Sequence, residues 1–497
     1  MLIDPVATFA IRTPSALACV DLTSGQRWDY REFDRAINRV ANWLVERLGP
    51  ASGERVATVA RNSANGLILS LACVRAGAIY VPCNWRLATE EVALIVADSQ
   101  PQITFCDDEF RTAAATSLTL SELLNLTACQ PTVPPLQARR ELTEVSTLLY
   151  TSGTSGSPKG VMLSELNALA SQFAFNSGNN VSASSVFLCD MPMFHTAGLF
   201  VNARAPLLAG GAVLVSQGFN PGVTLQRLSD SKLAISHYFS VPQMASMLWD
   251  HPDFDAAKLQ HLQVYATGGA PNSKEQIQRF VDAGIPMSDG YGMTEAGSIA
   301  GIPVGNPELA VRKAGSCGAI FLTVETKIVD EQGETVVSGE SGELWVRGPG
   351  VTAGYWRQPE KTEEAFRDGW LMTGDMARLD GDGFLFIVDR KKDMFISGGE
   401  NVYPAEVERV IASMPSVASV AVVGVADAQW GEKGVAFVVP ATGKTLNLEE
   451  IEHGCREKLA PYKVPKHFVL AASLPYSTTG KLQKDKLRAT FLVTVTK

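Results

Sequence analysis

Short runs of β-forming residues alternate with helical segments through the first hundred residues of the chain. Such runs cover 55–60, 78–81 and 103–106, and the segments around 65–76 and 89–97 between them have helical character. A strand, a helix and a further strand form a βαβ unit, whose strands lie parallel and are covered by helices. This alternation predicts an α/β fold for the front of the chain.

One helix and one connection flank these units. Residues 30–48 place apolar side chains on a single helical face, at Phe33, Ala36, Ile37, Val40, Ala41, Leu44 and Leu48. Residues 111–141 are instead rich in Thr, Ser, Gln and Pro, which is typical of a surface connection. We therefore expect an amphipathic helix over 30–48 and no core element over 111–141.

The last hundred residues predict a second domain. A hairpin turn is indicated at Asp380–Gly383, and the charged cluster Asp389–Asp393 follows it like a junction. Pro404 opens a helix, β-runs cover 417–425 and 435–440, and another helix begins near residue 447. We expect a large multi-layer N-terminal α/β domain of mixed sheets and helices over 1–389. A smaller, mobile α+β domain is expected over 390–497.

Composition narrows the class of protein. The 497 residues are 46% hydrophobic and 19% charged with a net charge of −9, which fits a globular chain and gives no basic footprint for nucleic acid. The 8 cysteines are scattered without a paired spacing, as expected for reduced, mostly buried thiols. No secretory signal is visible, and Arg75 and Arg204 interrupt the longest apolar stretches. We expect a cytoplasmic protein without a transmembrane segment.

The segment Tyr150–Gly160 has the chemistry of a phosphate-binding loop. It reads Tyr-Thr-Ser-Gly-Thr-Ser-Gly-Ser-Pro-Lys-Gly and follows a short apolar run. Glycines let backbone N–H groups approach an anion, hydroxyls add donors, and Lys159 adds a positive charge. The spacing of Gly153 and Gly156 and the glycine after the lysine differ from a Walker A loop.

This loop resembles that of the adenylate-forming superfamily, which comprises acyl-CoA synthetases, peptide-synthetase adenylation domains and luciferases. Seven later segments resemble further motifs of the superfamily in the same order: Met191–His195, Gly268–Pro271, Tyr291–Glu295, Thr373–Asp375, Asp389–Asp393, Ser397–Asn401 and Thr479–Lys481. The resemblance covers about residues 20 to 490. It implies that a carboxylic acid attacks the α-phosphorus of ATP to give an acyl-adenylate and pyrophosphate, with Mg²⁺ present and CoA as the acyl acceptor.

The resemblance assigns roles residue by residue. Lys481 would bridge the carboxylate and the α-phosphate, Glu295 would bind Mg²⁺, Thr294 would contact phosphate, and His195 would be a gate near the carboxylate. The residues expected to contact ATP or CoA are Thr151, Ser152, Gly153, Thr154, Ser155, Gly156, Lys159, Gly269, Ala270, Pro271, Asp289, Gly290, Tyr291, Gly292, Met293, Thr294, Asp375, Arg390, Lys392, Ser397, Gly398, Gly399, Glu400, Trp430 and Lys466.

Within that set, the resemblance separates three groups. Asp375 would bind the ribose hydroxyls, Asp289 would lie near the adenine amine, and Lys392 would be a hinge of the small domain. Rotation about this hinge would move Lys481 out of the active site and bring the Ser397–Asn401 loop into it. The pantetheine arm of CoA would then run along that loop. Trp430 and Lys466 would contact pantetheine and a CoA phosphate.

The acyl pocket is expected to be aromatic, apolar or small. Its expected lining is Phe194, His195, Gly198, Gly268, Tyr291, Met293 and Ser298. Such a lining favours aryl, cinnamoyl-type or medium-chain acids over dicarboxylates. Three activities remain open from the sequence: an AMP-forming CoA ligase, a stand-alone adenylation enzyme that loads a carrier protein in trans, and a luminescent monooxygenase. A homodimer also remains open.

Overall fold

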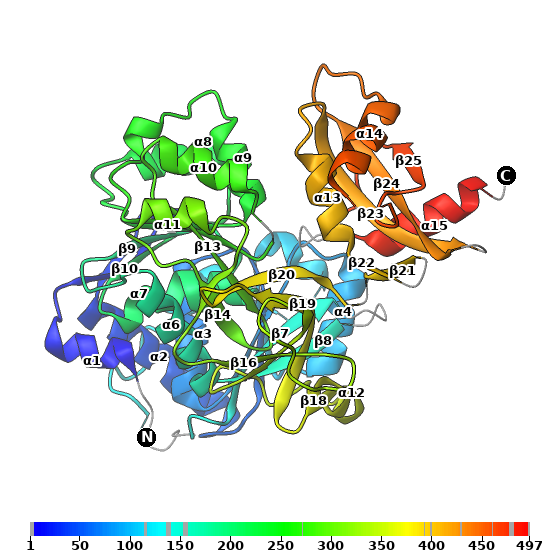
Figure 1. Cartoon of the computed structure of the whole chain (residues 1–497). Coiled ribbons are helices and arrows are strands. Elements are labelled where there is room, and N and C mark those ends of the chain that lie inside the picture. Colours follow the sequence, from blue (N-terminus) through cyan, green and yellow to red (C-terminus); the bar gives the residue numbers. More distant parts are fainter. Residues whose placement is uncertain are drawn as a thin grey trace. The chain divides into compact units, whose positions relative to one another are not determined.

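The computed structural model describes residues 4–113, 117–135, 141–152, 158–270, 272–391, 393–397, 400–427, 430–459, 461–476 and 482–495 (Figure 1). The chain forms two compact units. The first comprises Met1–Thr326, Val346–Leu371 and Gly383–Leu385, and the second comprises Lys327–Trp345, Met372–Asp382 and Phe386–Lys497. The predicted fold class, a large N-terminal α/β domain with a smaller C-terminal domain, is confirmed.

The first unit contains most of the helices. They are α1 (Pro5–Arg12), α2 (Tyr30–Leu48), α3 (Ala64–Ala76), α4 (Thr89–Ser99), α5 (Leu123–Leu126), α6 (Glu165–Gly178), α7 (Ala205–Leu208), α8 (Pro221–Ser229), α9 (Pro242–Trp249), α10 (Lys274–Asp282), α11 (Pro307–Arg312) and α12 (Pro359–Ala365). Short 3₁₀ segments are η1 (Asp108–Ala113), η2 (Leu120–Glu122) and η4 (Ala256–Lys258), and η3 (Ala197–Arg204) is a π-helix. Helix α2 has the predicted bounds and begins with a capping box, in which Asp29 accepts from the Glu32 N–H and Glu32 accepts from the Asp29 N–H.

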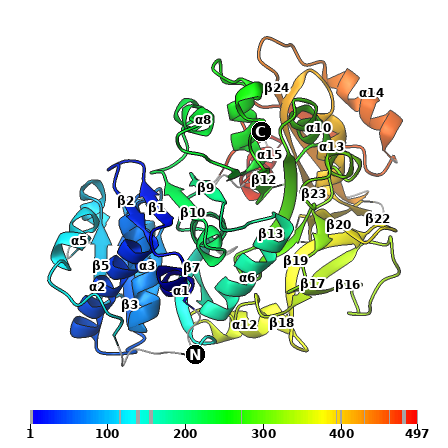
Figure 2. The ribbon, with the colours of Figure 1, turned by 90° about the vertical axis from the view of Figure 1, so that its left-hand side faces the viewer.

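One sheet of this unit contains the predicted βαβ units. Its strands are β3 (Arg55–Val59), β4 (Ile79–Cys83), β5 (Ile103–Cys106), β6 (Leu118–Thr119), β7 (Val145–Ser152) and β8 (Pro158–Ser164), in the order β6-β5-β3-β4-β7-β8. Strand β3 is parallel to β4 and β5. Val56 packs with α2 and α3, which lie side by side (Figure 2), whereas Ala57 packs with Val92 and Ile95 of α4. Successive side chains of the strand therefore point to opposite faces of the sheet, and a different layer of helices covers each face.

A second sheet carries the parallel strands whose ends form the candidate site. Its strands in the first unit are β1 (Leu17–Asp21), β2 (Arg27–Asp29), β9 (Val186–Cys189), β10 (Ala212–Val215), β11 (His237–Ser240), β12 (Val264–Gly268), β13 (Met287–Met293), β14 (Gly297–Gly301) and β15 (Gly318–Ile320), in the order β15-β14-β13-β12-β11-β9-β10-β1-β2. Strands β9 to β13 pair in parallel. Ligands of such sheets bind beyond the carboxyl ends of the strands, and Gly268 and Gly290 are paired at these ends.

Several strands carry residues of both units. These are β16 (Glu325–Val329), β17 (Gly342–Arg347), β19 (Trp370–Leu379) and β20 (Phe384–Arg390). The short strand β18 (Phe366–Arg367) lies wholly in the first unit. Residues Asp380–Gly383 join β19 to β20 in a turn, with Gly383 at φ +80°. The predicted hairpin at this position is confirmed.

The C-terminal part of the second unit is an α+β layer. Its elements are β21 (Phe395–Ser397), β22 (Glu400–Val402), α13 (Pro404–Ala412), β23 (Val417–Asp427), β24 (Gly431–Pro440), α14 (Leu448–Lys458), β25 (His467–Leu470) and α15 (Lys484–Val495). The sheet order is β22-β21-β24-β23, with β25 on β24. Successive residues of β23 pack into two different hydrophobic clusters on opposite faces of the sheet. Val422 packs with α13 and α14, and Val423 packs with Leu487 of α15. The predicted helix at Pro404 and the following strands are confirmed.

The expectation that residues 111–141 contribute nothing to the core is wrong for part of that segment. Leu120 and Leu123 are buried against α2 and α3. Asn38 of α2 donates to the carbonyl of Thr132, and this hydrogen bond holds the Pro-rich residues 131–135 against the same helix. The elements that hold these leucines, η2 and α5, are 3 and 4 residues long, which is too short for a periodic signal in the sequence.

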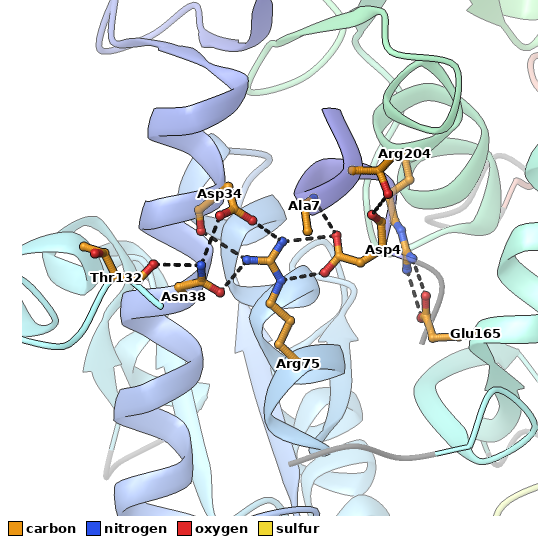
Figure 3. A network of polar contacts seen from close by, with 9 residues as sticks. Asp4, Ala7, Asp34, Asn38, Arg75, Thr132, Glu165 and Arg204 are labelled. Carbon is orange, nitrogen blue, oxygen red and sulfur yellow. Dashed lines mark hydrogen bonds and ion pairs between the residues drawn. The ribbon is translucent and has the colours of Figure 1, made fainter. Parts of the chain in front are cut away.

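A buried ion network fixes α1 on the rest of the first unit (Figure 3). Arg75 pairs with Asp4 and Asp34 and donates to Asn38, with only 5% of its side chain exposed. Arg204 pairs with the buried Glu165 nearby. Each buried guanidinium is thus matched by carboxylates, as burial of a charge requires.

The thiols match the expectation from the sequence. All eight cysteines are free; six are buried, Cys317 is half-buried and Cys129 is exposed. Burial raises the pKa of Cys83 to about 12 and that of Cys455 to about 11. Among the described residues, no helix has the length and apolar content needed to cross a membrane.

Candidate active site

The predicted phosphate loop joins strands β7 and β8, which pair antiparallel and together form the phosphate hairpin. Strands β7 and β8 pair Thr151 with Lys159 and Ser152 with Pro158. Gly153, Thr154, Ser155 and Gly156 lie outside the described residues. The flanking strands hold Lys159 at the base of the loop, where its Nζ lies 4.9 Å from the centroid of the Tyr355 ring. A strand follows this loop, whereas a helix follows a Walker A loop.

Glycines at the ends of β12 and β13 allow close backbone packing. A Cβ on Gly268 would lie 3.0 Å from the carbonyl oxygen of Gly290, and one on Gly290 would lie 3.0 Å from that of Ala300. Gly269 has φ +81°, a left-handed conformation that favours glycine. Gly269 and Ala270 are therefore presented in a tight turn directly after the strand, and Pro271 lies outside the described residues.

Asp289 lies on β13 beside this turn and is 6% exposed. Its Oδ1 accepts from the Thr267 hydroxyl at 2.8 Å, and Asn272 in turn donates to that hydroxyl at 3.0 Å. Burial, only partly offset by these donors, raises the pKa of Asp289 to about 8. This carboxyl group is therefore mostly protonated at neutral pH, and its oxygen atoms can still accept hydrogen bonds from a polar ligand.

The turn between β13 and β14 presents the Tyr291–Glu295 motif. Met293 pairs with Gly297, so that Thr294 and Glu295 lie in the turn itself. Gly297 has φ +66° and a Cβ there would lie 2.6 Å from the Cβ of Ser171, which donates to or accepts from Ser298 at 3.3 Å. The half-buried Glu295 accepts from the Tyr355 hydroxyl at 3.2 Å.

Phe194 and His195 lie just before the π-helix η3. Their rings are 4.6 Å apart in an edge-on arrangement, and Phe194 is buried. A Cβ on Gly198 would lie 2.0 Å from the carbonyl oxygen of Pro192, so only glycine fits this turn of the π-helix. π-Helical turns are frequent at functional sites.

Phe239 is an apolar residue of this region that the sequence did not single out. Its ring lies 3.2 Å from the Cβ position of Gly268 and edge-on to Phe175 at 6.2 Å. The same apolar cluster includes Ala197 and Val201 of η3. The cluster therefore links η3 to the end of β12, from which several of the predicted acyl-lining residues come.

In the second unit, Asp375 and Arg390 are in direct contact. Arg390 Nε lies 2.7 Å from Asp375 Oδ1, and only 2% of the Asp375 side chain is exposed. The backbone N–H of Asp375 donates to the Thr373 hydroxyl at 3.1 Å. The two residues predicted for nucleotide contact thus form one charged pair, while Lys392 lies outside the described residues.

The predicted CoA contacts of the second unit also converge. Lys466 Nζ lies 5.0 Å from the Trp430 ring, a cation–π contact. Ser397 pairs with Gly431, next to Trp430, and with Glu400 in the β21–β22 hairpin. Gly398, Gly399 and Lys481 lie outside the described residues, and their roles stay predictions.

The donor set of the first unit fits magnesium. Among the described residues, no group of three or more His, Cys, Asp or Glu side chains could hold a metal ion by itself. Mg²⁺ is commonly bound by one or two carboxylates while phosphate oxygens and water complete its shell. Glu295 on an accessible turn meets that requirement, and a bound Mg²⁺ would neutralise phosphate charge there.

Two protein-family models match the chain. The AMP-binding enzyme model covers residues 6–356, and the AMP-binding enzyme C-terminal domain model covers residues 406–481. A feruloyl-CoA synthase of Amycolatopsis sp. is 37% identical over 472 residues, which span 94% of each chain.

Solved structures match this chain over nearly its whole length. ATP-bound MatB from Rhodopseudomonas palustris has a TM-score of 0.89 and 31% identity, covering 98% of this chain and 99% of that one. The o-succinylbenzoate CoA synthetase of Bacillus subtilis, in complex with ATP and magnesium ion, has a TM-score of 0.84 and 28% identity, covering 97% and 98%. The resemblance found in the sequence motifs is confirmed: the chain belongs to the AMP-binding enzyme family of adenylate-forming acyl-CoA ligases.

Proposed function

We propose that the protein is an ATP-dependent carboxylate–CoA ligase that acts on aromatic acids. The acid and ATP give acyl-AMP and pyrophosphate, and acyl-AMP and CoA then give acyl-CoA and AMP. The observation that carries this proposal is the arrangement around Tyr355. There, Lys159 of the phosphate hairpin and Glu295, a carboxylate suited to Mg²⁺, contact one side chain.

The residues supply the groups that this reaction needs. A free carboxylate is a poor acyl donor, and attachment of AMP turns its oxygen into part of a leaving group. The transferring phosphorus needs positioned cations and donors more than it needs a side-chain nucleophile. Lys159 and Lys481 supply positive charge, Thr294 a hydroxyl, and Glu295 a ligand for the metal that neutralises phosphate oxygens.

Two carboxylates are proposed to contact the nucleotide. Asp289, beside the turn at Gly269, accepts from the adenine amine, and Asp375 accepts from the ribose hydroxyls while Arg390 holds its carboxylate. In the second half-reaction, Lys392 acts as the hinge. Trp430 and Lys466 contact CoA, and their mutual packing keeps an aromatic face and a cation together.

The aromatic substrate class follows from the apolar cluster. Phe194 and Phe239 are buried, and Phe175 and Phe239 meet edge to face. Aromatic rings pack well on such faces. The feruloyl-CoA synthase and the o-succinylbenzoate CoA synthetase among the relatives carry aromatic acids in their names. Medium-chain acids are the second class to test, and we place the reaction in the cytoplasm.

A panel of acids tests the proposal. Purified protein is given MgATP, CoA and, separately, benzoate, cinnamate, ferulate, octanoate or malonate, and AMP release is measured with and without CoA. Aromatic acids should give the highest kcat/KM. Hydroxylamine trapping reports acyl-AMP directly, so adenylation without CoA transfer would point to a carrier-protein thiol as acceptor. Light scattering on the same preparation tests for a homodimer.

A further inference from the structure

The segment Thr352–Trp356 runs beside strand β8 and is fixed to it by main-chain contacts. The Trp356 N–H donates to the Gly160 carbonyl at 2.7 Å, and the Met162 N–H donates to the Gly354 carbonyl at 3.0 Å. The Thr352 hydroxyl donates to the Met162 carbonyl at 2.6 Å. The backbone position of Tyr355 is therefore set by the same strand that ends the phosphate hairpin.

A second set of contacts ties this segment to Glu295. The Thr352 N–H donates to the main-chain carbonyl of Glu295 at 2.7 Å. The Tyr355 N–H donates to the hydroxyl of Thr362 at 2.9 Å, and a Cβ on Gly354 would lie 2.3 Å from Thr362 Cγ2. Tyr355 is thus clamped between β8, the turn after β13 and α12, with little freedom to move.

The side chain of Tyr355 contacts two charged residues through different parts of its structure. Its hydroxyl donates to Glu295 Oε1 at 3.2 Å, and its ring face lies 4.9 Å from Lys159 Nζ. An ordinary phenol has a pKa of about 10, so the hydroxyl is protonated and can donate throughout the physiological pH range.

We propose that Tyr355 is a positioning residue that orients the Glu295 carboxylate toward the metal and holds the Lys159 ammonium beside the phosphate loop. The proposal rests on the proposed function. A hydrogen bond to a carboxylate ligand fixes the direction of its free oxygen, and an aromatic face attracts an ammonium group without neutralising it. One rigid side chain thereby sets the spacing between the negative and positive groups that would receive MgATP.

Two substitutions separate the two contacts. Tyr355→Phe removes only the hydroxyl and keeps the ring under Lys159, whereas Tyr355→Leu removes both. Binding of ATP is measured by isothermal titration calorimetry with Mg²⁺ and with EDTA, in the absence of acid and CoA. Tyr355→Phe should weaken MgATP binding about tenfold, the usual loss for a support of a metal ligand, and leave metal-free ATP binding within about twofold. Tyr355→Leu should weaken both.

A matched control removes a tyrosine hydroxyl elsewhere in the same unit. Tyr30 is buried and its hydroxyl donates to the Gly211 carbonyl at 2.7 Å. Tyr30→Phe should lower the melting temperature and leave both ATP affinities unchanged. Combined with Glu295→Gln, Tyr355→Phe should add little further loss of MgATP affinity, because its effect acts through the carboxylate.

Each outcome decides between positioning and mere packing. Equal weakening with and without Mg²⁺ in Tyr355→Phe, or a lower melting temperature with unchanged affinities, overturns the proposal. Full additivity with Glu295→Gln also overturns it. If the wild-type protein itself fails to bind MgATP, the proposed function fails; if the wild type binds and Tyr355→Phe shows no metal-selective loss, only this inference fails.

Discussion

Asp289 gives a prediction whose size can be worked out from its surroundings. Its pKa is raised from 3.8 to about 8 because the carboxyl is buried and receives few hydrogen bonds. Such a displacement corresponds to about 6 kcal/mol between the protonated and ionised forms. Below pH 4 the carboxyl is protonated in both states. Between pH 4 and 8 the folded protein retains the proton that the unfolded chain has lost.

The sign of the effect follows from this proton. Because the folded state binds more protons in this window, the group's contribution to the free energy of unfolding falls by about 1.4 kcal/mol per pH unit as pH rises. Asp289→Asn removes the titration, and any lost contact to Thr267 adds an offset that does not depend on pH. The stability of the variant relative to wild type should therefore rise from pH 5 to pH 8 and level off above it.

Urea unfolding at pH 5, 6, 7, 8 and 9 measures this difference, with fluorescence and circular dichroism compared for coincident transitions. Asp253→Asn, which changes an exposed carboxylate, is the control and should shift stability by less than about 0.5 kcal/mol at every pH. Parallel curves for wild type and Asp289→Asn would refute the reasoning, since they would mean that Asp289 is already ionised at pH 5.

Three further predictions concern the half-reactions. Lys481→Ala should raise the barrier to adenylate formation by several kcal/mol, at about 1.4 kcal/mol per tenfold in rate, and spare thioester formation from supplied acyl-AMP; equal losses in both assays would contradict this role. Asp375→Ala should raise the ATP KM far more than the acid KM, because it removes the proposed ribose acceptor and the Arg390–Asp375 ion pair; an unchanged ATP KM in steady-state assays would count against it. Lys392→Pro fixes φ near −65° and should still release pyrophosphate but fail to acylate CoA; thioester formation in proportion to adenylation would show that no rotation about residue 392 is needed.

Local chemistry made part of the site predictable from the sequence. Glycines, hydroxyls and Lys159 in one short segment predicted a phosphate loop, and the strands on either side of that segment pair with each other. Asp289 lies two residues before the recognisable motif Tyr291–Glu295. The αβ alternation likewise predicted β3, α3 and β4 because each element is formed by neighbours in the chain.

Tyr355 could not be found in that way. Its partner Glu295 is sixty residues earlier in the chain, and the two meet only because the segment after β17 returns to β8. Neither periodicity nor composition encodes such a return. The same holds for Phe239, whose packing against Gly268 depends on the parallel register of β11 and β12.

The distribution of thiols gives the protein a ready point for chemical labelling. Cys129 is the exposed cysteine, Cys317 is half-buried, and the remaining six are buried. Maleimides react with accessible thiolates, so short exposure at neutral pH should place a fluorophore mainly on Cys129 of the first unit. A second cysteine introduced on the surface of α14 would then complete a donor–acceptor pair without removing any native thiol. Energy transfer between these dyes would test whether the C-terminal domain moves during a single turnover, as the proposed hinge at residue 392 requires.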